Sequence, residues 1–101
     1  MSASNGLSRV CASTAYANGA TGGDNVKIAI LDTGLNLQTD GDIGHAEFGT
    51  VGSSSSNVVL GTLADVYAWD AVPEDDDGHG THVAGIIGAQ KTGYNMHGVA
   101  Y

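Results

Sequence analysis

Residues 77–85 read Asp-Gly-His-Gly-Thr-His-Val-Ala-Gly, and this stretch holds the most specific pattern in the chain of 101 residues. It places His79 between two glycines, at the start of a run of small and apolar residues. We expect a buried helix over 79–89, although Gly80 and Gly85 lower its intrinsic propensity. Both glycines therefore indicate places where the helix backbone packs very close to another segment.

The position of His79 at a helix start suggests its chemistry. Unpaired N–H groups at a helix N-terminus disfavour positive charge. We therefore expect the imidazole to stay neutral near pH 7, where it can accept a proton. Glycines on both sides would let a substrate backbone approach the ring. His82 follows three residues later, and we expect it to pack or to make a structural hydrogen bond.

A second feature is the run 26–31, Val-Lys-Ile-Ala-Ile-Leu, which ends at Asp32. A short apolar run of this kind is typical of a strand buried on both faces of a parallel sheet. The position just past the carboxyl end of such a strand is where open α/β sheets bind ligands. Taken alone, Asp32 is better explained as a turn-capping carboxylate. Taken with His79, it matches the carboxylate and imidazole of an Asp–His–Ser triad, in which the carboxylate orients the ring.

Four further segments carry weaker patterns. Residues 12–20 are weakly helical, and a cluster of Gly, Thr and Asp over 19–24 indicates a turn. Residues 57–60 and 65–69 are weak strand candidates.

Five segments resemble the subtilase family of serine peptidases, in the family's order. Tyr16–Gly22 resembles the lead-in to the family's first strand, and Val26–Leu35 resembles its catalytic-Asp segment. His45-Ala46-Glu47-Phe48 resembles the His-Pro-Glu-Phe step that comes shortly after. Asp77–Gly85 is similar to the catalytic-His signature, and Gly98-Val99-Ala100 to the Gly-Val-Ala that follows the helix. The resemblance implies that Asp32 and His79 are catalytic, and Asp before His is the subtilisin order. The resemblance also implies an α/β fold, with an incomplete subtilisin-like parallel sheet flanked by helices. Residues 1–101 would then form the N-terminal part of one catalytic domain.

The family's Gly-Thr-Ser-Met-Ala segment and its oxyanion Asn do not occur in residues 1–101. The serines present lie in small polar stretches such as 53–56, and none has the strained strand-to-helix setting of a nucleophile. We expect this chain to be inactive alone, because it supplies Asp and His but not Ser. Its partners would be a protein or peptide substrate and the missing C-terminal part of the domain. The alternative is a non-enzymatic fragment that binds another protein.

Composition excludes several classes of function. Three Lys and Arg residues stand against eleven Asp and Glu residues, with a formal net charge of −8, so a nucleic-acid partner is not expected. The single cysteine, Cys11, cannot form an internal disulfide, and we expect a buried or idle thiol. The sequence has no membrane span, and residues 1–10 do not form a signal peptide. The resemblance nevertheless implies a secreted or extracytoplasmic protein.

Two kinds of cation site were weighed against this pattern. His79 and His82 differ from a helical zinc pair, because they are three residues apart and lack the intervening Glu. The acidic loop 74–77 has the oxygen chemistry that calcium prefers, but not the alternating ligand pattern. We expect it to be a solvated loop near the substrate cleft. Glu47 stands where the family often supplies a carboxylate ligand, so calcium at Glu47 is the one cofactor that the resemblance suggests.

Overall fold

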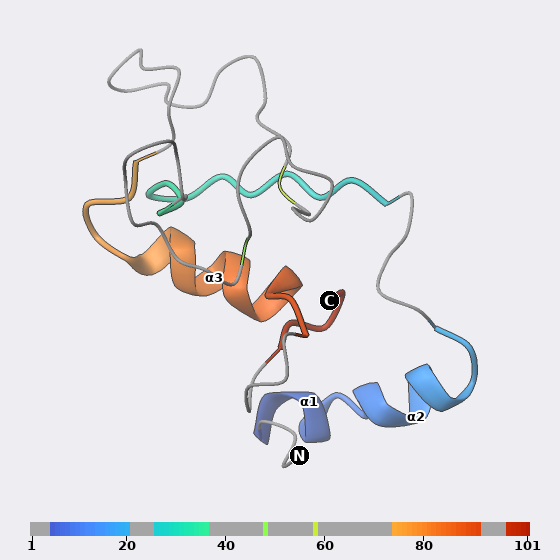
Figure 1. The fold of residues 1–101 in the computed structure, drawn as a ribbon. Coiled ribbons are helices and arrows are strands. Elements are labelled where there is room, and N and C mark those ends of the chain that lie inside the picture. Colours follow the sequence, from blue (N-terminus) through green and yellow to red (C-terminus); the bar gives the residue numbers. More distant parts are fainter. Residues whose placement is uncertain (1–4, 21–25, 37–47, 49–57, 59–73, 92–96) are drawn as a thin grey trace.

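The computed structural model describes residues 5–20, 26–36, 48, 58, 74–91 and 97–101. Its helices are α1 (Asn5–Arg9), α2 (Ala12–Ala17) and α3 (His79–Gly88). In Figure 1, α3 lies between the segment 26–36 and the pair formed by α1 and α2. The helix predicted over 79–89 is confirmed and ends at Gly88, but it is not a buried helix: Gly80 and Ala84 are buried, whereas Ile86 is 57% exposed. The weak helical pattern of 12–20 forms the short α2, whereas α1 was not predicted.

The buried apolar side chains among the described residues are few, and most are small. They are Leu7, Ala12, Phe48, Ala84 and Ala89. Phe48 and Ala84 form one cluster, against which Leu35 and Val58 pack. Because Ala84 lies in the middle of α3, this cluster gives the helix its apolar contact with the segment that follows Asp32.

Residues 26–31 run as an extended segment along α3 (Figure 1), and the described residues contain no β-ladder. The apolar side chains of the segment are exposed, with Val26 at 67% and Leu31 at 93%. Burial on both faces needs neighbouring strands and covering helices, and among the described residues neither covers this segment. The strand and the parallel sheet stay predictions. The candidate strands 57–60 and 65–69 lie outside the described residues, apart from Val58.

The carboxyl end of α3 is held by the end of the chain. Backbone N–H groups of 98–100 donate to the carbonyls of Ile86, Ile87 and Ala89 at 2.8 to 3.0 Å. These bonds include carbonyls that a helix end leaves without an intrahelical partner. A Cβ atom at Gly98 would overlap the Ile87 backbone, so a glycine is required for this close approach.

An aromatic group joins α2 to the same segment. The Tyr16 hydroxyl donates to the Val99 carbonyl at 2.6 Å. The Tyr101 ring lies edge-on to Tyr16, with ring centroids 5.2 Å apart, and to His97, with centroids 4.7 Å apart. The Lys91 ammonium lies 4.7 Å from the Tyr101 centroid, within the range of a cation–π contact. These contacts link the amino-terminal helices to the end of the chain.

Cys11 is exposed, so of the two alternatives expected for its thiol, the buried one is wrong and the idle one stays a prediction. The residue lies at the junction of α1 and α2 with φ of 55°, a left-handed conformation that L-residues adopt mainly in turns. A residue at such a junction points outward instead of into a core. Among the described residues, no helix is long and apolar enough to cross a membrane.

We expect residues 1–101 on their own to unfold in a broad thermal transition. In the part of the chain that the structure describes, few apolar residues are buried, whereas Val26, Ile28, Leu31 and Ile86 are each more than half exposed. A chain that buries so little apolar surface gains little cooperativity. Far-UV circular dichroism on heating measures this, and a sharp, cooperative transition would contradict the expectation.

Candidate active site

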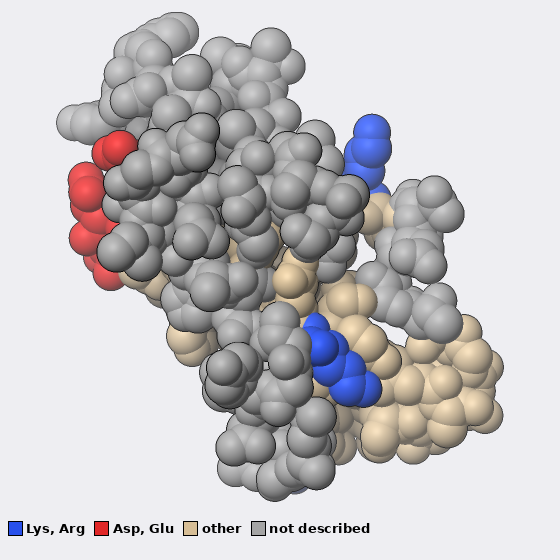
Figure 2. Space-filling view, viewed as in Figure 1, with Lys and Arg blue, Asp and Glu red and all other residues tan. Residues whose placement is uncertain are grey.

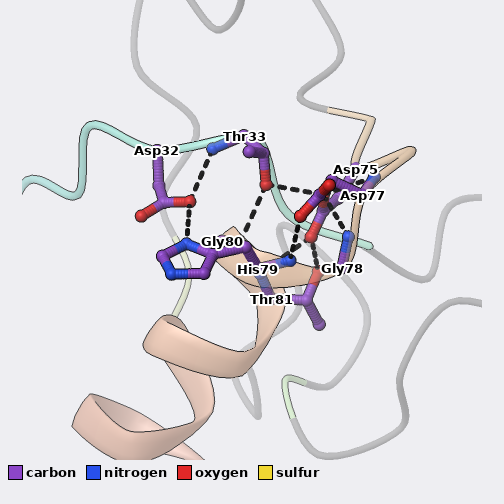
Figure 3. A network of polar contacts seen from close by, with 8 residues as sticks. All are labelled: Asp32, Thr33, Asp75, Asp77, Gly78, His79, Gly80 and Thr81. Atoms are coloured by element: carbon purple, nitrogen blue, oxygen red, sulfur yellow. Dashed lines mark hydrogen bonds and ion pairs between the residues drawn. The ribbon is translucent and has the colours of Figure 1, made fainter.

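The structure brings Asp32 and His79 together, as the sequence predicts. Asp32 Oδ1 lies 2.7 Å from His79 Nδ1 (Figure 3). An ionised carboxylate can only accept a hydrogen bond, so Nδ1 carries the proton and donates it. The other ring nitrogen, Nε2, then has a free lone pair and points away from Asp32. The imidazole is 66% exposed and the Asp32 side chain 18%, so the ring can be reached from outside while its partner is largely covered.

The two groups change each other's pKa in opposite directions. The hydrogen bond from His79 lowers the pKa of the Asp32 carboxyl, and the Thr33 backbone N–H, 2.7 Å from Oδ1, lowers it further. The hydrogen bond to Asp32 and then its charge raise the pKa of His79, and the charges of Asp77 and Asp75 add to this. The helix start was expected to disfavour a charged ring; the carboxylates of Asp32, Asp77 and Asp75 act in the opposite direction and raise the pKa of His79.

The N–H groups at the start of α3 are paired with side-chain oxygens. Those of residues 78 and 81 donate to the carboxylate of Asp75, each at 2.8 Å. The N–H of residue 79 donates to Asp77 at 3.3 Å, and that of residue 80 to the Thr33 hydroxyl at 2.9 Å. A helix leaves its first N–H groups without intrahelical partners. Here these partners come from the preceding loop and from the segment that carries Asp32.

Asp75 is the centre of this network. Its carboxylate accepts five hydrogen bonds, from the hydroxyls of Thr33 and Thr81 and from the N–H groups of residues 77, 78 and 81. Partial burial opposes its ionisation. The bonds from Thr81 and from the residue-78 N–H outweigh this effect and hold the pKa of the Asp75 carboxyl well below its usual range. A solvated loop was expected over 74–77; this is wrong for Asp75, because its oxygens face the helix start.

The other acidic residues of the loop, Glu74, Asp76 and Asp77, are exposed. Figure 2 shows acidic side chains together at one edge of the molecule, with Lys and Arg side chains away from them. The charges of Asp77 and Asp75 reach the His79 ring. The expected position of this loop near a substrate cleft stays a prediction.

The hydroxyls of Thr33 and Thr81 connect the loop to two further segments. Thr33 Oγ1 donates to Asp75 at 2.8 Å and accepts from the N–H of Gly80. Thr81 Oγ1 donates to Asp75 and accepts from the N–H of Asn36 at 2.9 Å. Sequence analysis missed Asp75 and both threonines. The only signal available was their closeness in sequence to Asp32 and His79.

Glycine makes the close approach of these segments possible. A Cβ atom at Gly80 would overlap the Gly34 backbone, and one at Gly34, where φ is 127°, would overlap the Glu74 backbone. The predicted close approach is thus confirmed for Gly80. Within the described segments it is wrong for Gly85, because a Cβ atom there would meet none of their atoms within 4 Å.

Two further residues were singled out in the sequence. His82 was expected to pack or to make a structural hydrogen bond; it is exposed, and it takes no part in the network around Asp75. Glu47 lies outside the described residues, so its predicted calcium site stays a prediction. Among the residues that the structure describes, no group of three His, Cys, Asp or Glu residues is placed to hold a metal ion.

A comparison with known families now adds to this geometry. The model of the Subtilase family matches residues 23–101, most of the chain. The chain belongs to the subtilase family. It is similar to Minor extracellular protease Epr of Bacillus subtilis (strain 168), at 38% identity over 77% of the chain and 10% of that protein. It is also 38% identical to Subtilisin BL of Lederbergia lenta, over 94% of the chain and 29% of that protein.

A third relative of this subtilase chain is Extracellular serine protease of Serratia marcescens, 34% identical over 95% of the chain and 8% of that protein. The chain thus spans less than a third of the length of each of these three relatives. No solved structure matches this one significantly.

We expect Asp32→Asn to lower the pKa of His79 toward its ordinary value of 6.5, because the main cause of the rise is removed. The contribution of His79 to stability is fully present below pH 6.5, the ordinary pKa of the ring, and is lost as pH rises through its raised pKa. The contribution of Asp32 is fully present above pH 3.8, the ordinary pKa of the carboxyl, and is lost as pH falls through its lowered pKa. The pair thus stabilises the fold most between these two ordinary values. An NMR titration of the ring measures the change, and Asp76→Asn is the control; an unchanged His79 pKa in Asp32→Asn would contradict the assignment.

Gly80→Ala should separate α3 from the Asp32 segment, because the added methyl group has no room beside Gly34. The His79 pKa should then fall, as in Asp32→Asn. Gly85→Ala is the matched control on the same helix, since the space around it is open. It should raise the helical signal, because Ala is favoured over Gly by about 1 kcal/mol in a helix interior. The same NMR titration and circular dichroism distinguish the two; equal behaviour would refute the close-approach argument.

Proposed function

We propose that the protein is a serine endopeptidase of the subtilisin type, in which Asp32 and His79 are two members of an Asp–His–Ser triad. The serine would come from residues outside 1–101. The observation that carries this proposal is the 2.7 Å contact between Asp32 Oδ1 and His79 Nδ1. This contact leaves Nε2 free on the exposed side of the ring, where a serine hydroxyl could donate to it. Membership of the subtilase family supports the same roles.

Each group then has one task in peptide-bond hydrolysis. Nε2 of His79 takes the proton of the serine hydroxyl as its oxygen attacks the peptide carbonyl carbon. Asp32 keeps the proton on Nδ1 and stabilises the imidazolium that forms. The ring passes its proton to the leaving amine, which leaves an acyl-enzyme. A water molecule, deprotonated by the same Nε2, releases the acyl group.

The raised pKa of His79 sets the acid limit of this chemistry. A protonated ring cannot accept the serine proton, so the rate falls as pH drops through the pKa of His79. Asp32, with its lowered pKa, stays ionised across this range. The same interaction therefore makes the ring a stronger base and moves the loss of activity to higher pH.

The fold that this function needs is also a proposal. An α/β domain with a parallel sheet flanked by helices would cover the exposed apolar side chains of Val26, Ile28 and Leu31. Residues 1–101 would form the N-terminal part of that domain, and the rest of the domain would be their partner. A calcium site at Glu47 rests on the resemblance alone, and no step is assigned to it.

The names of the relatives support a place of action. Two of them are called extracellular. We propose that this protein likewise acts outside the cytoplasm, on protein or peptide substrates.

In the catalytic domain that contains these residues and the serine, Asp32→Asn should lower kcat by about 10⁴-fold, because the ring loses its orienting carboxylate. His79→Ala should abolish turnover and labelling of the serine by a fluorophosphonate probe. Asp76→Asn, in the same acidic environment, should stay close to the unmodified protein. Residues 1–101 alone should remain unlabelled, because they hold no nucleophile. Turnover retained by His79→Ala would overturn the proposed function.

A further inference from the structure

We propose that Asp75 is a positioning residue of this site: through Thr33 and Thr81, its carboxylate holds the Asp32 segment against the start of the His79 helix. The inference rests on the proposed function, because it assigns Asp75 a part in the same reaction. Asp75 does not touch the Asp32–His79 contact itself. It acts on the two backbones that carry these side chains.

Such a device is needed because Asp32 and His79 are 47 residues apart in sequence and lie at the surface. A single exposed contact between charged groups is weak, since water and salt screen it. The orientation of the ring toward Asp32 must therefore come from contacts around the pair. Misplacement of a catalytic group by about 1 Å can cost roughly 10²-fold in rate.

Asp75 determines how the two threonine hydroxyls point. Each hydroxyl has one proton, and each donates it to Asp75. The lone pairs of Thr33 then face the N–H of Gly80, and those of Thr81 face the N–H of Asn36. Gly80 of α3 therefore donates to the Asp32 segment, and Asn36 of that segment donates to Thr81 of α3. Without the carboxylate, both hydroxyls are free to rotate, and both links lose their fixed direction.

The neighbouring acids show that charge alone does not explain this arrangement. Asp77 bonds to the N–H of His79 at 3.3 Å, so it contacts α3 but not the segment 33–36. Asp76 is exposed, and its side chain makes no hydrogen bond in the part of the chain that the structure describes. Asp75 contacts both segments. The charge of Asp75 also contributes to the raised pKa of His79, so bonding is separated from charge most cleanly by a change at Thr33 that leaves the carboxylate in place.

The test compares Asp75→Asn with Asp76→Asn in the complete catalytic domain, because both changes remove one negative charge from the same loop. An Asn side chain keeps one acceptor oxygen, but an NH2 group replaces the other. The NH2 group cannot accept the hydrogen bonds that Thr81 donates to Asp75 Oδ2. Asp75→Asn should lower kcat by about 10²-fold with little change in KM, and it should shift the acid limb of the kcat/KM profile to lower pH. Asp76→Asn should lower neither kcat nor the pH of that limb by a comparable amount.

A second pair keeps the charge constant. Thr33→Val removes the hydroxyl that connects Asp75 to Gly80, and Thr33→Ser keeps it. The valine variant should lose kcat and shift its acid limb, and the serine variant should recover both. If Asp75→Asn does not fold, this pair decides the question, because equal kcat values in the two variants would overturn the proposal.

The outcomes separate this inference from the proposed function. If Asp75→Asn matches Asp76→Asn while His79→Ala is inactive, the positioning role of Asp75 is wrong and the triad stands. If His79→Ala retains turnover, the proposed function itself fails. A fall in activity for Thr33→Val without a shift of the acid limb would indicate a purely structural role and would also refute the inference.

Discussion

The first backbone N–H groups of α3 need partners, and the way they find them organises this structure. A helix cannot satisfy these groups itself. In this chain the oxygens come from Asp75, Asp77 and the Thr33 hydroxyl, so the helix start is tied both to its own loop and to a remote segment. That remote segment carries Asp32. The requirement to pair N–H groups thus brings a carboxylate beside the His79 ring as a consequence.

Two carboxylates close to one another have different tasks here. Asp32 accepts a hydrogen bond from the imidazole of His79, a group that can gain or lose a proton. Asp75 faces backbone N–H groups and hydroxyls, which do not titrate near neutral pH. Both have a lowered pKa, but for different reasons: the first because of His79 and the second because its hydrogen bonds outweigh the effect of burial. One acid is therefore suited to assist proton transfer, and the other to hold a backbone in place.

The polar groups at the ends of α3 have hydrogen-bond partners, whereas much of the described apolar surface is exposed. The N-terminal end of α3 is capped by residues 75 and 77 of its own loop and by the remote residue 33, and the C-terminal end by 98–100. Among the described residues, the middle of the helix contacts a small cluster around Phe48 and Ala84. Directional bonds hold the site geometry locally, while the apolar surface of 26–31 remains exposed. The site is thus better defined than the core on which it rests.

Local pattern was enough to predict the helix at 79–88 and the meeting of Asp32 with His79, since both depend on residues adjacent in sequence or on a specific motif. It could not show which of the successive acids in 74–77 turns inward. That choice depends on the turn at Gly78, where φ is 92°, and on hydroxyls from two other segments.

The sequence by itself determined the types of group at the site and the order in which the chain presents them. Only the tertiary structure decided how they act on one another. Hydrogen bonds and charge effects depend on distances of a few ångströms, and those distances arise when segments more than forty residues apart pack through Gly34 and Gly80.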